Sequence, residues 1–166
     1  MKTSFLRGLA QFAVLGIALC GSGMASAGVT VTFVQSERYA DMPFSPWDRE
    51  TVMKDFDQYL VKLGQKWLPA GQDLKIEVLD IDLAGRLKRN TGHEVRVLTG
   101  GADWPMMEIR YTLESGGKVL RTGTDRVADM NYFQSHIKNH AKSRESLYYE
   151  KLMLQDWFKA KFAAAP

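Results

Sequence analysis

The sequence has a single cysteine, Cys20, and it lies in the N-terminal segment. The residues after this segment therefore offer no disulfide, no thiol nucleophile and no cysteine-based metal site. Hydrophobic packing must then stabilise the fold. The chain also lacks internal repeats, low-complexity tracts and linker-like segments, which indicates one domain rather than several.

The N-terminal residues have the composition of an export signal. Lys2 and Arg7 give a basic start, residues 9–19 are apolar, and residues 25–27 read Ala-Ser-Ala, the small-x-small pattern that signal peptidases cleave. A bilayer span needs about 20 apolar residues, so this run is too short to cross a membrane. We expect cleavage after residue 27, with an uncleaved membrane anchor as the alternative.

Cleavage would leave 139 of the 166 residues, which is enough for one domain with a hydrophobic core. It would also leave 20 of the 22 basic residues against 19 acidic ones. Because nucleic-acid-binding domains carry a clear excess of positive charge, we expect no nucleic-acid partner. We predict a signal peptide at residues 1–27, a single α+β domain at residues 28–166 without a transmembrane segment, and a periplasmic location.

The clearest structural pattern is a β-hairpin at residues 106–126. Apolar and polar residues alternate along its first half, which is typical of a strand with one buried face. Gly116 and Gly117 can form a two-residue turn, because glycine adopts positive φ angles at little cost. With that turn, Leu113 would lie opposite Leu120. The same register places these residues together on the polar face: Glu108, Arg110, Thr112, Glu114, Arg121 and Asp125.

Three further segments have strand patterns. Residues 29–34 alternate β-branched or apolar residues with threonine, and residues 94–98 form a short strand after a basic, turn-rich stretch at residues 85–92. Within residues 74–83 the apolar positions change parity at Leu79, which indicates a bulge or a bend. We therefore expect an antiparallel sheet of four or five strands.

Two segments have helical periodicity. Residues 47–68 follow a Ser-Pro start, and their apolar side chains recur at three- and four-residue steps opposite charged ones. Residues 147–162 predict a C-terminal helix, with Ser143 or Ser146 as its cap. The fold class is α+β, with the long amphipathic helix packed on one face of the sheet.

Several short stretches occur together, in an order that is similar to one known family. They are residues 29–34, 80–85, 102–105, 109–113, 117–120, 129–132 and 149–158. This set resembles a family of exported proteobacterial proteins catalogued only as a domain of unknown function, family 3016. The resemblance spans essentially all of the chain after the signal and implies a small periplasmic domain. It implies no activity, substrate or catalytic residue.

Asp80 and Asp82 project from the same side of a strand end. Such a pair suits cation binding or general acid/base chemistry, and one of the two pKa values would rise if the pair were buried. With His93 the pair could serve a small hydrolase; alternatively it faces solvent or caps the next turn. The chain has no nucleophile elbow, phosphate-binding glycine loop or zinc-protease helix motif, which favours a protein without catalytic activity.

His136 and His140 lie four residues apart, a spacing that on a helix places both rings on one side and can hold Zn²⁺ or Cu²⁺. A third ligand would have to come from elsewhere, for example His93, Asp129 or Glu145. A metal or small-ligand carrier is therefore one alternative, and a polar surface segment is the other. We expect no cofactor.

The remaining candidates are loop residues and basic residues. An exposed aromatic ring in a loop would mark a partner surface, although aromatics near sheet ends more often close the core. The local basic runs could contact an anionic polymer. We predict a non-catalytic cell-envelope accessory or binding module whose partner is an envelope protein or an anionic envelope polymer. The candidate contact residues are Asp80, Asp82, Asp103, Trp104, Arg110, Arg121, Asn131 and Tyr132.

Overall fold

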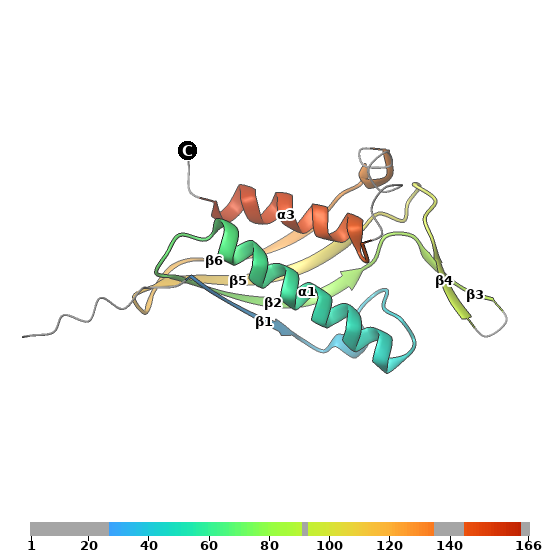
Figure 1. The fold of residues 1–166 in the computed structure, drawn as a ribbon, viewed down its shortest axis with the longest axis horizontal. Coiled ribbons are helices and arrows are strands. Elements are labelled where there is room, and N and C mark those ends of the chain that lie inside the picture. Colours follow the sequence, from blue (N-terminus) through green and yellow to red (C-terminus); the bar gives the residue numbers. More distant parts are fainter. Residues whose placement is uncertain (1–26, 91–92, 135–144, 164–166) are drawn as a thin grey trace, which may run out of the picture.

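The computed structural model describes residues 27–90, 93–134 and 145–163 (Figure 1). In this part of the chain no helix is both long and apolar enough to cross a membrane. The fold class is α+β, as predicted. The elements in chain order are β1 (Gly28–Phe33), the 3₁₀ helix η1 (Ser36–Arg38), α1 (Pro46–Trp67), β2 (Gln72–Asp82), β3 (Arg86–Asn90), β4 (His93–Val97), β5 (Met106–Ser115), β6 (Lys118–Ala128) and α3 (Tyr148–Phe162).

The main sheet has four strands in the order β1-β2-β5-β6. The prediction of an antiparallel sheet is wrong for β1, which pairs with β2 in parallel. The reason is the connection: α1 carries the chain back to the start of the sheet, so that β1 and β2 run in the same direction. The other neighbours are antiparallel.

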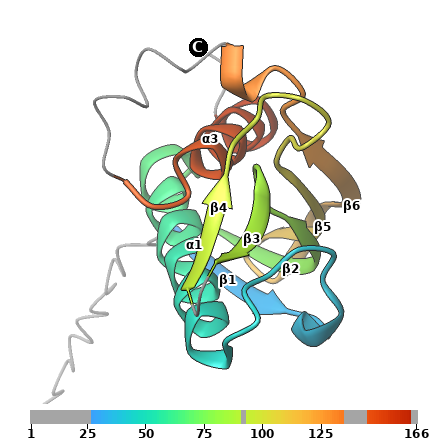
Figure 2. The same cartoon turned by 90° about the vertical axis from the view of Figure 1, so that its right-hand side faces the viewer.

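A second sheet consists of the hairpin β3–β4, which projects from one end of the main sheet (Figure 1) and faces the viewer in Figure 2. The sequence predicted one short strand here, preceded by a turn-rich stretch. That stretch forms β3 instead, because its alternating residues pair with β4 from Arg86↔Val97 to Asn90↔His93. Such strands give a weak apolar–polar alternation, and of their described side chains Arg86, Lys88 and Val95 are exposed.

Two β-bulges set the direction of the side chains. The register of β2 shifts between Val78 and Asp80, which confirms the bulge predicted at Leu79. A second shift in the β5–β6 hairpin places Leu113 opposite Arg121. The predicted pairing of Leu113 with Leu120 is therefore wrong. The bulge adds one residue to β6, so that from Arg121 onward each side chain of β6 lies on the opposite face from the one predicted.

The second bulge divides the predicted polar face of the hairpin. Arg110 stays on the open face of the sheet, where it forms an ion pair with Glu77 (3.3 Å). Arg121 instead donates to the backbone carbonyl of Lys161 in α3 (2.7 Å), and Asp125 pairs with the Lys161 ammonium (2.8 Å). These two residues therefore attach the C-terminal helix to the sheet.

Both helices lie side by side on the same face of the sheet (Figure 1). α1 begins one residue before the predicted start, and the Ser45 hydroxyl accepts a hydrogen bond from the Asp48 amide (3.5 Å) as an N-cap does. The cap of α3 is Leu147, which has a positive φ angle of 57°, so the prediction of a serine cap is wrong. The buried side chains between helices and sheet include Phe56, Leu60, Leu63, Leu74, Ile76, Val78, Ile81, Met107, Ile109, Tyr111, Leu113, Met153, Leu154, Phe158 and Phe162.

Gly64 allows α1 to lie close to β1. A Cβ atom at this position would overlap with the side chain of Val29. We expect Gly64→Ala to lower the free energy of unfolding by about 1 kcal/mol, because overpacking of about 1–3 kcal/mol outweighs the helix propensity gained from alanine, which is about 1 kcal/mol. Urea denaturation measures this change.

The control for this prediction is the same substitution in a Val29→Ala background. There the overlap is absent, so Gly64→Ala should become neutral or stabilising through its helix propensity alone. An equal loss of stability in both backgrounds would contradict the close-approach explanation.

Candidate functional site

A polar depression lies where β2 leaves the main sheet, and we call it the sheet-end cleft. Its volume is about 530 Å³. One wall comes from the segment between β1 and α1, and the other comes from the start of β3 and the loop before β5. The cleft is lined by Ser36, Glu37, Tyr39, Ala40, Asp41, Met42, Pro43, Phe44, Arg49, Asp82, Gly85, Arg86, Leu87, Ala102 and Asp103.

The first wall is fixed to β2 by hydrogen bonds. The buried Tyr39 hydroxyl donates to the Val78 carbonyl (2.8 Å). Asp80 accepts from the backbone amides of Ala40 (2.8 Å) and Ile81 (2.9 Å) through the same carboxylate oxygen. Asp80 is thus occupied by the backbone and does not line the cleft. Its contacts hold the wall in place.

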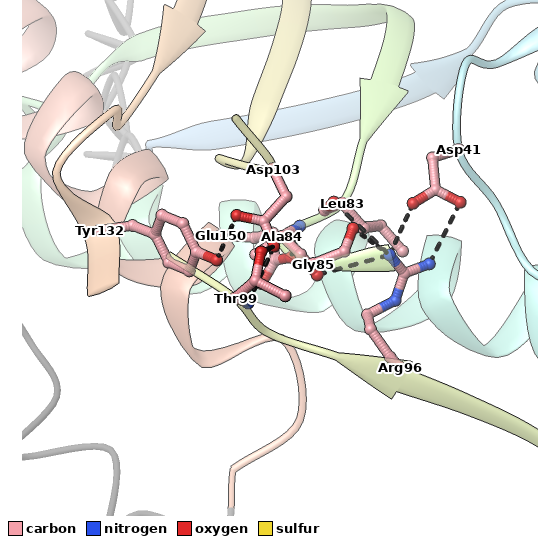
Figure 3. A network of polar contacts seen from close by, with 9 residues as sticks. All are labelled: Asp41, Leu83, Ala84, Gly85, Arg96, Thr99, Asp103, Tyr132 and Glu150. Carbon is pink, nitrogen blue, oxygen red and sulfur yellow. Dashed lines mark hydrogen bonds and ion pairs between the residues drawn. The ribbon is translucent and has the colours of Figure 1, made fainter. Parts of the chain in front are cut away.

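Arg96 of β4 joins the two walls (Figure 3). Its guanidinium forms a two-pronged ion pair with Asp41, with distances of 2.6 and 3.3 Å. The same group also donates to the carbonyls of Leu83, Ala84 and Gly85 at 3.4–3.5 Å. The planar fork of arginine can satisfy several acceptors at once, so one side chain ties together the first wall, β4 and the end of β2.

Asp103 organises the second wall. Its carboxylate accepts from the amide (2.9 Å) and hydroxyl (2.7 Å) of Thr99 and from the hydroxyl of the buried Tyr132 (3.0 Å), as Figure 3 shows. Its backbone carbonyl accepts from the Gly85 amide (2.8 Å). Burial acts to raise the pKa of Asp103, but the hydrogen bonds from Thr99 and Tyr132 outweigh it and lower the pKa.

Asp82 differs from its acidic neighbours because its carboxylate has no hydrogen-bond or ion-pair partner among the described residues. It is half-buried, lines the cleft, and lies beside Asp41, with which it forms a parallel β-bridge. Burial raises its pKa, and the negative charges of Asp41 and Asp80 add to this, while Arg96 and Arg126 act in the opposite direction. Asp82 is therefore the half-buried carboxylate of the cleft that remains available to a ligand, whereas Glu37, which also lines the cleft, is exposed to solvent.

Glu150 of α3 is a second unusual carboxylate that lies behind the cleft. It is 3% exposed and accepts a hydrogen bond from the Ala84 amide (2.8 Å). Burial raises its pKa, and hydrogen bonds from the backbone and the charges of Arg96 and Lys151 oppose this shift. Glu150 thereby connects α3 to the segment that Arg96 holds from the other side.

The remaining predicted contact residues are dispersed. Trp104 is half-buried and packs with Tyr132 in a small cluster behind the cleft. Arg110 lies on the open sheet face and Arg121 against α3. Asn131 is exposed, and its amide donates to Asp129 in a turn (3.0 Å). The structure thus brings Asp82 and Asp103 into one cleft, supported from behind by Asp80 and Tyr132.

Most of the histidine side chains predicted to bind metal lie outside the described part of the structure. His136 and His140 lie outside the described residues, and so does the side chain of His93. The backbone of His93 pairs with Asn90 at the tip of the β3–β4 hairpin, whereas Asp82 lies at the end of β2. No group of three or more histidine, cysteine, aspartate or glutamate residues in the described chain could hold a metal ion.

Sequence reasoning missed Asp41, Arg96 and Glu150. Asp41 lies in a segment without periodicity, and Arg96 reads as an ordinary polar residue of a short strand. Glu150 occupies a helix in which most glutamates would face solvent. No local signal could have identified these residues, because their partners lie 11 to 66 positions away in the chain.

The pKa shifts of Asp103 and Glu150 have opposite signs, so these residues should affect the pH dependence of stability in opposite directions. The folded-state pKa of Asp103 is lowered from 3.8, so its ionised form stabilises the fold above that pH and the effect is lost as the pH falls through the folded-state pKa. The folded-state pKa of Glu150 is raised from 4.5, so its contribution is present below that pH and is lost as the pH rises through the raised pKa.

Urea denaturation across pH measures both effects. The unfolding free energy of the wild type minus that of Asp103→Asn should increase with rising pH, and the wild type minus Glu150→Gln should decrease. Parallel pH profiles for the two variants would contradict the assignment.

Comparisons with known proteins show which family this chain belongs to. No curated protein matches it. A 2.35 Å crystal structure of a minor lipoprotein from Acinetobacter baumannii aligns with 82% of this chain and with 88% of the lipoprotein chain. The two chains are 13% identical, and the TM-score of 0.23 does not indicate a shared fold. Residues 27–160 match the family described as "Protein of unknown function (DUF3016)". The match covers most of the chain and confirms the resemblance, and the protein belongs to this family.

Proposed function

We propose that this protein is a non-catalytic binding module of the bacterial cell envelope and that its ligand or partner occupies the sheet-end cleft. The proposal rests on the environment of the Asp82 side chain. Its half-buried carboxylate lines the cleft without a hydrogen-bond partner among the described residues. This carboxylate is partly accessible to solvent, and an ionised carboxylate accepts hydrogen bonds, so it can bind a ligand that donates to it.

The construction of the walls supports binding over catalysis. Asp41, Asp80 and Asp103 are all occupied by internal hydrogen bonds or ion pairs, and they fix the backbone around Asp82. A site whose walls are already in place loses little entropy when a ligand binds. Asp41 and Asp103 in the cleft and Asp80 behind it thus act as supports, which leaves Asp82 as the half-buried contact group.

Two large exposed rings, one in the cleft and one three residues further along the chain, could add apolar contacts. Phe44 lines the cleft with 66% of its surface exposed, and Trp47, in the first turn of α1, is 80% exposed. Aromatic side chains contribute strongly to the energy of protein interfaces. Their position supports an extended contact that begins in the cleft and continues along the start of α1.

The envelope location rests on the N-terminal sequence. The predicted cleavage after Ala27 falls immediately before β1, which begins at Gly28, so the folded domain would keep all of its strands. We expect mass spectrometry of the exported protein to identify Gly28 as its first residue. A cytosolic protein that retains residue 1 would contradict the location, and Ala27→Pro, which blocks signal peptidase, should abolish the cleavage without altering residues 28–166.

Photo-crosslinking in living cells tests the proposed function. A photo-reactive residue replaces Glu37 or Arg86, which are exposed on the two walls, or Arg110, which lies on the open sheet face. We expect crosslinked products from the two wall positions because the cleft holds the ligand. Asp82→Asn should reduce these products several-fold, since a neutral amide accepts hydrogen bonds more weakly than a carboxylate.

Glu108→Gln is the matched control, because it removes the same charge from an exposed position outside the cleft. It should leave the products unchanged. Products obtained only from Arg110 would assign binding to the open sheet face, and products from the cleft that do not respond to Asp82→Asn would exclude Asp82 as the contact. Either result would overturn the proposal.

A further inference from the structure

The sheet-end cleft contains charges of both signs that do not pair with each other. Glu37 and Asp82 are acidic, and Arg49 and Arg86 are basic. Within the described ranges 27–90, 93–134 and 145–163, no ion pair involves any of these four side chains. Glu37 and Arg86 are exposed to solvent, whereas Asp82 and Arg49 are half-buried. The half-buried pair is the feature that needs an explanation.

Asp82 and Arg49 have complementary hydrogen-bonding capacity left over. An ionised carboxylate only accepts hydrogen bonds, and a guanidinium has five N–H groups that only donate. Asp82 receives no donor from the described residues. Arg49 donates to the Phe44 carbonyl (3.3 Å), and its Nε is buried without a partner. The cleft is therefore lined by a carboxylate that lacks a donor and by a guanidinium that lacks a carboxylate partner among the described residues.

The other two carboxylates in the walls of the cleft, apart from the exposed Glu37, are already paired. Arg96 already neutralises Asp41, and Thr99 and Tyr132 already satisfy Asp103. The negative charges of Asp41 and Asp80 add to that of Asp82 and favour a cationic group there, while Arg96 and Arg126 oppose this effect. A ligand of a single charge would satisfy either Asp82 or Arg49 and leave the other group unpaired.

We propose that the cleft binds a zwitterion of the α-amino-acid type, with its ammonium group on Asp82 and its carboxylate on Arg49. This inference rests on the proposed function and names the chemical class of the ligand. A free amino acid and a short peptide with free ends share this chemistry. The volume of about 530 Å³ lies within the usual range of ligand sites and exceeds that of a single amino acid. Met42, Phe44 and Leu87 supply apolar contacts for the ligand side chain.

The test is an NMR titration of the ¹⁵N-labelled mature protein with four compounds. L-alanine and alanyl-alanine are zwitterions, N-acetyl-alanyl-alanine lacks the ammonium group, and alanyl-alanine amide lacks the carboxylate. We expect saturable shifts of the Ala40, Gly85 and Ala102 amides with at least one zwitterion. Each blocked compound should bind about tenfold more weakly, because it loses one charge-assisted contact.

Two variants assign the ends of the ligand. Asp82→Asn should remove the preference for alanyl-alanine over its acetylated form, and Arg49→Gln should remove the preference over its amide. Thermal melting shows that each variant is folded, and Glu108→Gln should behave as the wild type. Binding of alanyl-alanine without binding of alanine would show that the cleft recognises a short peptide. Binding of both would show that a free amino acid is sufficient.

Two results would overturn this inference: equal affinity for the blocked and unblocked compounds, or no saturable shift with either zwitterion. The crosslinking experiment separates this failure from that of the proposed function. If products that depend on Asp82 persist in cells, the cleft binds a ligand of another class. If they are absent as well, both proposals fail.

Discussion

The guanidinium of Arg96 is the contact on which the candidate site depends. It joins Asp41 from the first wall to the carbonyls of Leu83, Ala84 and Gly85 at the end of β2. Both partners of the ion pair keep about a quarter of their side-chain surface exposed, so the pair is partly shielded from water without bearing the full cost of burial. Without it, the segment before α1 and the β3–β4 hairpin would lack their shared anchor.

The neighbouring carboxylates of β2 show how position determines chemical role. Asp80 and Asp82 are two residues apart and belong to the same strand end, yet Asp80 accepts two backbone amides and Asp82 accepts none from the described residues. The difference arises because the segment around Ala40 passes directly over Asp80. One carboxylate therefore supports the wall, and the other is left for a ligand.

The polar attachment of α3 follows from a single extra residue in β6. The bulge at the hairpin directs Arg121 and Asp125 toward the helices, where Asp125 accepts from the Trp157 indole (2.9 Å) and from Lys161. Gly123 lies between them opposite Tyr111, and a Cβ atom there would come within 2.7 Å of the tyrosine hydroxyl. Because glycine has no side chain, the Tyr111 ring can pack beside Trp157 and Phe162.

The sequence by itself determined the elements whose periodicity is strong: α1 with its Ser45 cap, the β5–β6 hairpin with its two-glycine turn, and the bulge at Leu79. It also placed Asp82 among the candidate residues. Only the tertiary structure decided that β1 pairs in parallel, that Arg121 lies on the helix-covered face of the sheet, and that Asp41 forms an ion pair with Arg96. The physical reason is that apolar periodicity reports which face of an element is buried. The partner of a charged side chain depends instead on segments that are distant in the chain and close only after folding.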